Sequence, residues 1–419
     1  MKMTIQSIGQ GGDGIAEKDD DRWFVALTAP GDVVTATPEK KRGKGGPNRA
    51  VLETVLEAGP ARTDAPCPHF GACGGCAVQH LKPAFLSAWK RELIVEALQR
   101  RGLTDVPVTA GFEGDAGRRR RVALTALVIA KGRVTLGFHE RRGKRVIDIG
   151  PCPVMRPELE ALLEPLRRVV GALLKPGQEL RAQANVTDGG IDLLLDGPLA
   201  DDLTTHETLS DFARTTDLAR ISIVDGDMPR TVIERRPPHL DWSRLRVVPP
   251  PGVFLQADGE AEICMRTLIA DWSEGARAAV DLFCGVGTLT SSLPLTQATL
   301  AVDSDRQAIA ALKAGIDATP GADARVEERN LFRRPLRADE LKRFDLAVLD
   351  PPAAGAKDQA EQLAVSRVGR VIYVSCAPGS FARDARTLVD GGYRLVEVRP
   401  IDQFYWAADV ELAALFVRE

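Results

Sequence analysis

Hydrophobic and polar positions alternate differently in each part of this chain. In the first sixty residues, short apolar runs such as 23–27 are separated by Gly-rich turns, which predicts a small antiparallel β-barrel over residues 1–60. Residues 84–101 instead carry apolar side chains at helical spacing, which predicts a helix. Its apolar face consists of Trp89, Leu93, Ile94 and Leu98.

The middle of the chain alternates again with the period of a strand. Apolar residues recur through stretches such as 122–128 and 191–195, so we expect a mostly β central domain over about 118–248. Three consecutive prolines and a glycine then follow at 249–252. Because proline cannot continue a central strand or a helix interior, this segment predicts a domain junction.

Beyond the junction, strands and helices alternate. An apolar strand over 278–283 precedes a turn at Gly285–Gly287 and an expected helix start over 288–295. Such alternation predicts an α/β fold with a doubly wound parallel sheet. Further strands are expected to end at Asp303, near Val326, at Asp350 and at Ser375, followed by two terminal strands over 395–398 and 410–417.

Composition narrows the class of protein without identifying it. The 419 residues are 44% hydrophobic and 27% charged, typical of a soluble protein with two or three domains. No apolar run approaches the roughly 20 residues of a membrane span, and the N-terminus lacks a signal-peptide pattern, so we expect a cytoplasmic protein. The net charge of -3 does not favour nucleic acid. Basic residues nevertheless gather at 40–49, 118–121 and 133–145, either to bind phosphates or as a solvated surface.

Three cysteines lie within ten residues, and a fourth lies far away. Cys67, Cys73 and Cys76 surround a glycine pair, and Cys152 stands between two prolines. In a cytoplasmic chain such thiols are expected to bind metal rather than form disulfides. Structural zinc sites usually take two close pairs, whereas three thiolates from one loop and a remote fourth favour a fully ligated [4Fe-4S] cluster. The alternative is a set of buried free cysteines.

The loop after the first strand of the α/β region suggests a nucleotide site. Gly285 and Gly287 let the backbone approach a ligand closely. The loop lacks the spacing of dinucleotide-binding and phosphate-binding loops. An acid after the next strand, Asp303, can bind ribose hydroxyls, and Asn330 and Asp350 follow later strands. This set fits S-adenosylmethionine, although a Gly-rich turn alone is equally consistent with a plain turn.

Cys376 is the candidate nucleophile. It follows an apolar strand at the carboxyl edge, where doubly wound sheets bind ligands, and precedes a helix expected near Ser380. A helix N-terminus would help to stabilise its thiolate, as a catalytic cysteine requires. The alternative is a buried cysteine at a strand end.

Taken in order, these motifs resemble the RNA uracil-5 methyltransferases that combine an iron–sulfur cluster with an N-terminal TRAM domain, typified by bacterial 23S ribosomal RNA enzymes. The resemblance covers nearly the whole chain. It rests on Pro30-Gly31-Asp32, Cys67 to His80, Pro151-Cys152-Pro153, Phe254-Leu255-Gln256, Asp281 to Gly287, Asp350-Pro351-Pro352, Ser375-Cys376, and Asp402-x-Phe404 to Val410-Glu411.

The resemblance implies a role for each site residue. Cys376 would attack C6 of uracil, Glu411 would remove the C5 proton, and Phe254 would stack on a base swung out of the RNA. Asp350 would stand between cofactor and base. The S-adenosylmethionine site would be lined by Gln256, Phe283, Thr288, Asp303 and Asn330, and the cluster would be held by Cys67, Cys73, Cys76 and Cys152.

The resemblance also implies three units and an RNA partner. A TRAM barrel would span 1–60, an iron–sulfur domain 61–85 and 115–252, and a methyltransferase domain 86–114 and 253–419. We expect a monomer that binds 23S ribosomal RNA, with a structural rather than redox cluster and with the basic stretches contacting phosphates. Cys264 and Cys284 are assigned to packing.

Three positions depart from the family pattern. Ala377 follows the nucleophile where the family usually has Asn, Asp409 replaces the usual His, and Ala407 replaces Thr or Ser. Other functions also stay open: the same chemistry on a transfer RNA uridine, an amino-group methyltransferase suggested by Asp350-Pro-Pro, or a non-catalytic RNA-binding module.

Overall fold

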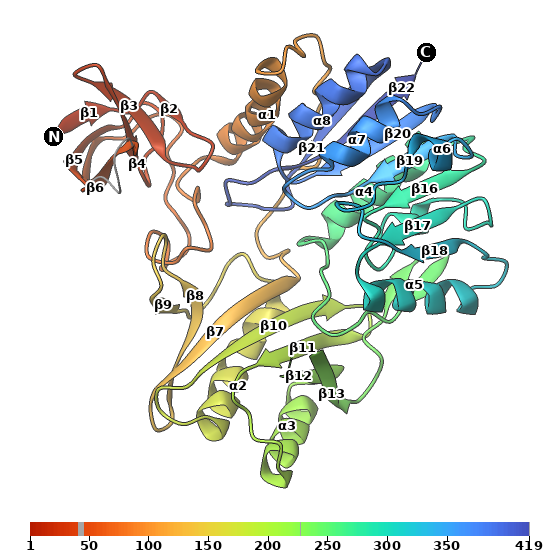
Figure 1. The fold of residues 1–419 in the computed structure, drawn as a ribbon. Helices are drawn as coiled ribbons and strands as arrows, with labels where there is room; N and C mark the ends of the chain where they lie inside the picture. Colours follow the sequence, from red (N-terminus) through yellow and green to blue (C-terminus); the bar gives the residue numbers. More distant parts are fainter. Residues whose placement is uncertain (41–45, 227, 419) are drawn as a thin grey trace.

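The computed structural model describes residues 1–40, 46–226 and 228–418, which form three lobes (Figure 1). The N-terminal lobe and the central lobe each contain one sheet, and the C-terminal lobe contains a third with helices on its faces. In the first predicted basic stretch, Lys41, Arg42 and Lys44 lie outside the described residues.

The N-terminal lobe is a six-stranded sheet. Its strands are β1 (Lys2–Thr4), β2 (Ser7–Ile8), β3 (Gly14–Lys18), β4 (Asp21–Val25), β5 (Val33–Pro38) and β6 (Asn48–Glu57). They pair in the order β1-β5-β6-β4-β3-β2, antiparallel except for β4 with β6. Alternate residues of these strands, including Ala16, Val25 and Val34, bury their side chains in one small core.

The predicted helix is α1 (Pro83–Gln99), and all four residues of its expected apolar face are buried. Ile94 and Leu98 pack into the core of the C-terminal lobe, and Trp89 packs against Val78 of the cysteine-containing loop. The helix therefore joins this loop to the C-terminal lobe.

The central lobe contains more helix than the sequence pattern predicted. A seven-stranded sheet in the order β13-β12-β11-β10-β7-β8-β9 packs against two helices. The longer one, α2, carries Leu159, Leu162, Leu166 and Val169 at helical spacing, a signal that the strand-like patterns around it obscured. The elements are β7 (Arg121–Ala130), β8 (Arg133–His139), β9 (Val146–Asp148), α2 (Pro157–Leu173), β10 (Glu179–Thr187), β11 (Gly190–Asp196), α3 (Leu203–Thr215), β12 (Arg220–Asp225) and β13 (Met228–Glu234).

The C-terminal lobe is the predicted doubly wound sheet. Its strand order is β18-β17-β16-β19-β20-β22-β21, and all strands run parallel except β22, which is antiparallel to both of its neighbours. A short hairpin, β14 (Leu240–Trp242) and β15 (Leu245–Val247), precedes it. The elements that follow are α4 (Gly259–Trp272), β16 (Ala279–Leu282), η1 (Thr290–Ser292), β17 (Leu300–Asp303), α5 (Arg306–Ala318), β18 (Arg325–Glu328), α6 (Ala338–Leu341), β19 (Leu346–Leu349), α7 (Lys357–Ala364), β20 (Arg370–Ser375), α8 (Pro378–Asp390), β21 (Tyr393–Ile401) and β22 (Glu411–Arg418).

One expected element of this lobe is absent. The helix start expected over 288–295 is only the short 3-10 turn η1, and Pro294 lies two positions after its last residue. The turn lies against α4, with the Arg266 Nε donating to the Ser291 hydroxyl at 3.0 Å.

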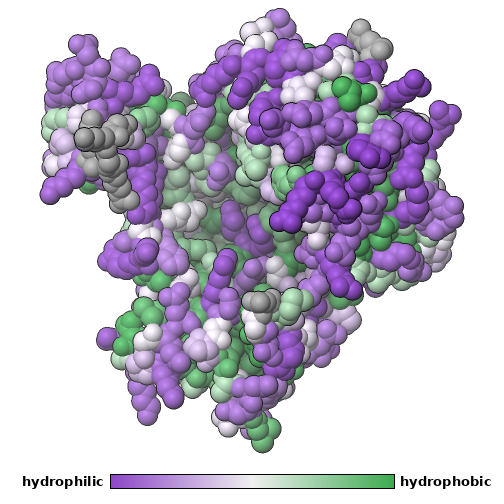
Figure 2. Space-filling view, viewed as in Figure 1, coloured by the Kyte–Doolittle hydropathy of each residue, from purple (hydrophilic) through white to green (hydrophobic). Residues whose placement is uncertain are grey.

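The three lobes surround a hollow, visible in the centre of Figure 2, where pale and apolar surface is framed by hydrophilic side chains. No helix among the described residues is long and apolar enough to cross a membrane.

Candidate functional site

The carboxyl ends of four neighbouring parallel strands bring the predicted site residues to one edge of the sheet. Phe283 follows β16, Asp303 ends β17, Asp350 follows β19 and Cys376 follows β20. Since β16 lies between β17 and β19, and β20 lies beside β19, these four positions are contiguous in space.

The loop after β16 is tightly held. Phe283 and Gly285 have positive φ angles of 65° and 53°, which turn the backbone sharply. The Gly285 amide donates to the Asp303 carboxylate at 2.9 Å. A Cβ on Gly287, whose φ is 94°, would approach the side chain of Leu312 to 2.4 Å. Glycine at 287 is therefore required by both conformation and packing.

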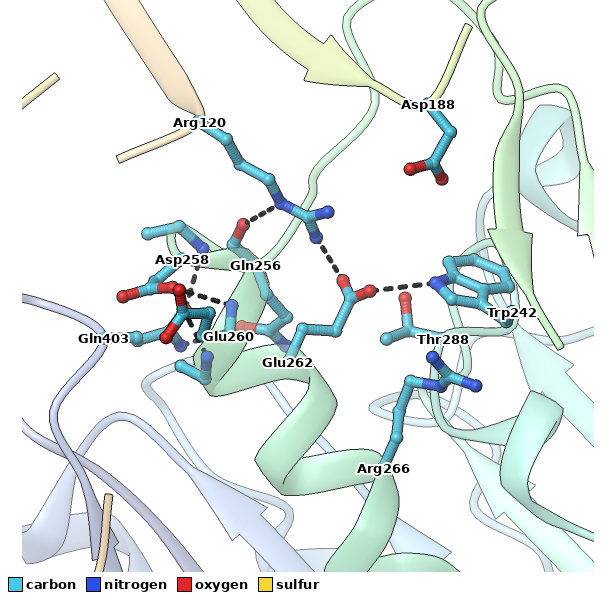
Figure 3. A network of polar contacts seen from close by, with 12 residues as sticks. Arg120, Asp188, Trp242, Gln256, Asp258, Glu260, Glu262, Arg266, Thr288 and Gln403 are labelled. Carbon is cyan, nitrogen blue, oxygen red and sulfur yellow. Dashed lines mark hydrogen bonds and ion pairs between the residues drawn. The ribbon is translucent and has the colours of Figure 1, made fainter. Parts of the chain in front are cut away.

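The residues expected at the cofactor site occupy different parts of this edge. The side chain of Asn330 accepts from the Phe332 and Arg333 amides, so it shapes the loop after β18. Phe332, which the sequence pattern did not identify, lies with its ring centre 5.4 Å from that of Phe283. The two rings line a cavity of about 140 Å³. Thr288 lies near Arg266 on the other side of the loop (Figure 3).

Three carboxyl groups are buried at the site. Asp281 on β16 is fully inaccessible, and Glu411, the first residue of β22, is 3% exposed. Burial raises the pKa of Asp281 to about 7, and burial together with the nearby Asp350 raises the pKa of Glu411 well above its usual range. Burial likewise raises the pKa of Asp350. None of the ion pairs among the described residues involves these three acids, and their raised pKa values favour the protonated, uncharged forms.

Gln256 lies on the carboxyl-group side of the site. Its Nε2 donates to Asp350 at 3.1 Å, and its Oε1 accepts from Gln403 at 2.8 Å. Gln403 in turn donates to Glu411 at 2.6 Å. Sequence reasoning missed Gln403, although it lies within the recognised motif that begins at Asp402.

Cys376 faces a cavity of about 340 Å³ between the N-terminal and C-terminal lobes. Antiparallel pairing of Ser375 with Leu412 places Cys376 across from Glu411. The cavity is also lined by Gln10, from a turn of the N-terminal sheet. The site is therefore composed of residues from two lobes.

The electrostatic setting of Cys376 differs from the expectation. Although α8 begins at Pro378, close behind it, burial and then the carboxyl groups of Glu411 and Asp350 raise the pKa of the Cys376 thiol to about 11. The negative groups outweigh any benefit from the helix N-terminus. A cationic ligand in the site would reverse this balance.

Phe254 is exposed, with 58% of its surface accessible. The Arg121 guanidinium lies over its ring at 4.1 Å. An aromatic ring held at the surface in this way can stack on a base.

Cys67, Cys73, Cys76 and Cys152 all line a single cavity of about 340 Å³. Burial, and to a smaller extent the three other nearby sulfurs, raise the pKa of the Cys76 thiol to about 12. As these side chains lie, no three described His, Cys, Asp or Glu residues converge tightly enough to hold one metal ion. The structure thus brings the remote Cys152 to the same cavity as the other three cysteines, without a single-ion site among the described residues.

The cysteine-containing loop, residues 67–80, contacts all three lobes. The His80 ring bonds to the Thr28 carbonyl of the N-terminal sheet at 3.0 Å, and the Gly74 amide donates to the His139 carbonyl of the central lobe. The Ala77 amide donates to the Trp406 carbonyl at 2.8 Å, in the segment that leads to Glu411. Residues 67–80 therefore link the lobes to one another.

The basic stretches are less available for phosphate than predicted. Arg120 is buried in an ion pair with Glu262, which also accepts from Trp242 at 2.8 Å (Figure 3). The phosphate-binding prediction is wrong for Arg120, because both partners are inaccessible to a phosphate group.

The third basic stretch also has a structural role. Asp13 of the N-terminal lobe pairs with Arg141 and Arg142 of the central lobe and with Arg49. Burial alone would raise the pKa of Asp13, but the bonds from Arg142 and Arg49 and the charge of Arg141 lower it. These ion pairs attach the N-terminal lobe to the central lobe.

Comparisons with known proteins agree with this geometry. The sequence pattern of the tRNA (Uracil-5-)-methyltransferase family matches residues 249–419. An uncharacterised RNA methyltransferase of Brucella melitensis is 41% identical, over 100% of this chain and 98% of the relative. The 23S rRNA (uracil(1939)-C(5))-methyltransferase of Halomonas elongata is 30% identical, over 98% of this chain and 88% of the relative.

The fold is also that of a solved structure. The tRNA (uracil-54, C5)-methyltransferase of Pyrococcus abyssi, crystallised with S-adenosyl-L-homocysteine, superposes with a TM-score of 0.75 at 23% identity, over 100% of this chain and 99% of the other. The lobes, the doubly wound sheet and the relatives together give one answer: the chain belongs to the RNA (uracil-5-)-methyltransferase family.

Proposed function

We propose that this enzyme transfers the methyl group of S-adenosylmethionine to C5 of a uridine in 23S ribosomal RNA, through a covalent bond from Cys376 to C6. The observation that carries this mechanism is the opposition of Cys376 and Glu411 across the β20–β22 pair. This opposition supports a mechanism in which one bound base meets both a nucleophile and a proton acceptor.

The chemistry needs both groups in turn. The Cys376 thiolate forms a bond to C6, and the C5–C6 π electrons pass to C5 and O4 as an enolate. C5 then takes the methyl group, and the C–S bond of the sulfonium breaks, leaving its electron pair on sulfur. Glu411 finally removes the C5 proton, the C5–C6 double bond re-forms and the thiolate departs.

The buried acids support a cationic cosubstrate. Asp281, Asp350 and Glu411 have no ion-pair partner among the described residues, and their raised pKa values favour the uncharged forms unless a cation binds. The sulfonium and ammonium groups of S-adenosylmethionine would favour ionisation of these acids, and the same positive charges would lower the pKa of Cys376 at the moment the thiolate is needed. Phe283 and Phe332 would then cover the adenine, and Asp303, at the end of β17, would lie toward the ribose.

The substrate is proposed to be ribosomal because the Halomonas elongata relative, which aligns over nearly the whole chain, bears that name. The matching family and the Pyrococcus abyssi structure bear transfer RNA names. Exposed Phe254 would stack on the target base in either case. The N-terminal sheet is proposed to be the TRAM domain, and it contributes Gln10 to the cavity of Cys376.

We further propose that the four cysteines hold a [4Fe-4S] cluster. A single zinc ion requires its ligands to converge on one point, whereas a cube binds each cysteine at a separate corner. Four thiols that line one cavity without converging fit the cube better. Bound there, the cluster would supply structure: it would fix residues 67–80 between the three lobes.

The test is methyl transfer from labelled S-adenosylmethionine to purified 23S rRNA and to tRNA from cells lacking the protein. Label should enter 23S rRNA at C5 of uridine, and Cys376→Ala should abolish it while Cys264→Ala, a half-buried cysteine outside the site, retains it. Label in tRNA alone would replace the ribosomal substrate. Undiminished transfer by Cys376→Ala would refute the covalent mechanism.

A further inference from the structure

Gln403 is a buried side chain between three parts of the site. Only 4% of its surface is accessible. Its Nε2 donates to the Gln256 Oε1 at 2.8 Å and to the Glu411 Oε2 at 2.6 Å, and its Oε1 accepts from the Ala257 amide at 2.7 Å. Both amide hydrogens and the carbonyl oxygen are therefore used inside the protein.

The orientation of this side chain is fixed by chemistry. The Ala257 N–H can only donate, so the atom facing it must be the Gln403 oxygen, and the Gln403 nitrogen must face Glu411. The same logic orients Gln256, whose oxygen faces Gln403 and whose nitrogen donates to Asp350. Figure 3 shows Gln256 also held from the other side, where the Arg120 Nε donates to its backbone carbonyl.

This contact makes the two oxygens of Glu411 unequal. The Oε2 accepts a hydrogen bond from Gln403, whereas the Oε1 is buried and has no partner among the described residues. A buried carboxylate oxygen without a donor is the more basic of the two and the one able to accept a proton from a bound ligand.

We propose that Gln403 is a positioning residue that holds Glu411 with its Oε1 toward the substrate, ready to receive the C5 proton of the uracil ring. This inference rests on the proposed function, since it assigns Glu411 the role of proton acceptor. In this role Gln403 acts through Glu411.

The side chains at positions 407 and 409 do not donate a hydrogen bond to Glu411, which leaves this role to Gln403. Ala407 has no polar side-chain atom, and Asp409 adds a negative charge that raises the pKa of Glu411. Among the described residues, Gln403 supplies the one side-chain donor bonded to the Glu411 carboxylate. The family departures at 407 and 409 thus leave an amide from position 403 to hold the base.

The groups that face Glu411 are all acidic or neutral. Asp350 approaches from the end of β19, Asp409 lies in its own loop and Cys376 lies beyond β20. The amide of Gln403 is the group that opposes their effect on the Glu411 pKa. Removing it should move the acidic limb of the pH–rate profile to higher pH, because a larger share of Glu411 is then protonated.

The experiment compares Gln403→Met, which retains length and volume but removes the donors, with the wild type. We expect turnover to fall by about 10- to 100-fold, as for one lost hydrogen bond to a charged group. The KM for RNA should change by less than about threefold. Because elimination is slowed, methyl-labelled RNA should remain covalently bound to the protein through Cys376 and be visible on a denaturing gel.

A matched control separates positioning from folding. Ser222 of β12 is fully inaccessible and shares a hydrogen bond with the Thr231 hydroxyl at 3.2 Å, in the central lobe and outside the site. Ser222→Ala should lose stability without trapping an adduct or altering the pH profile. Gln403→Glu should restore neither turnover nor the pH profile, because it adds another acid beside Glu411.

The outcomes distinguish this inference from the proposed function. If Glu411→Gln traps the methylated adduct and Gln403→Met does not, Gln403 does not position the base. An unchanged pH profile for Gln403→Met would contradict the inference in the same way. If Glu411→Gln turns over normally, or no variant forms an adduct, the assignment of Glu411 or of the covalent mechanism fails first.

Discussion

The guanidinium of Arg121 lies over the ring of Phe254, with its central carbon 4.1 Å from the ring centre. Arg121 is the first residue of β7 and lines the cavity of the four cysteines, whereas Phe254 follows the proline junction. This contact joins the cysteine cavity of the central lobe to the ring proposed to stack on the target base.

Substitution of this pair should weaken RNA use and leave cofactor binding intact. Phe254→Ala should reduce kcat/KM for RNA by about 10- to 100-fold, since base–aromatic stacking is worth about 1–3 kcal/mol. Arg121→Met should reduce it by a few fold, in line with a cation–π contact of about 0.5–1 kcal/mol. Steady-state kinetics against both substrates measure these effects. Arg277→Met, at a 93% exposed side chain on the opposite end of β16, is the matched control.

The raised pKa of Cys376 predicts that its thiol reacts slowly with alkylating reagents in the enzyme without cofactor. With a pKa of about 11, only about one thiol in ten thousand is ionised at pH 7, so alkylation by iodoacetamide should be slow and accelerate with pH. S-adenosylmethionine should increase the rate more than S-adenosylhomocysteine, because only the former carries the sulfonium charge. Mass spectrometry of the peptide that contains Cys376 measures the rate. Equal effects of the two ligands would contradict this electrostatic account.

Hydrophobic periodicity predicted the C-terminal lobe well, for a physical reason. The parallel strands β16 and β19 are buried throughout; β19 is an uninterrupted apolar run and β16 is interrupted only by Asp281, so each run marks where its strand ends. The predicted strand ends in turn give the positions of Asp350 and Cys376 at the carboxyl edge of the sheet. In the central lobe, α2 was missed because its leucines lie between strands whose alternation dominated the pattern.

Other parts of the site depend on contacts between distant segments. Gln403 is a polar residue in a loop, and its importance arises only when folding brings Gln256 and Glu411 to it from 147 and 8 positions away. Arg120 is likewise one of four consecutive arginines, and its burial follows from pairing with Glu262, 142 positions later. Local pattern carries no information about such partners.

The buried ion pair between Lys90 of α1 and Asp402 should stabilise the segment before Glu411. Lys90 is almost inaccessible and also donates to the Phe404 carbonyl at 2.9 Å. Lys90→Met should reduce the free energy of unfolding by about 3–5 kcal/mol, because it leaves the Asp402 carboxylate buried without its cation. Adding Asp402→Asn should restore part of this loss. Denaturant unfolding measures both variants, and the exposed Lys82→Met should change stability by less than about 0.5 kcal/mol.

If the four cysteines hold the proposed cluster, loss of one of them should affect the segment that leads to Glu411 as well as the iron content. Cys152→Ser should lower the iron and sulfide recovered with the protein, whereas Cys264→Ser should not, since Cys264 lies apart from the cavity of the four cysteines. The Ala77 and Val78 amides both donate to the Trp406 carbonyl. Loss of order in the cysteine-containing loop would therefore weaken two hydrogen bonds that fix the segment leading to Glu411. Hydrogen exchange of residues 402–411 should therefore accelerate in Cys152→Ser and not in Cys264→Ser. If iron is lost while exchange in this segment is unchanged, residues 67–80 do not transmit the state of the cluster to the active site. Retention of full iron by Cys152→Ser would remove Cys152 from the ligand set.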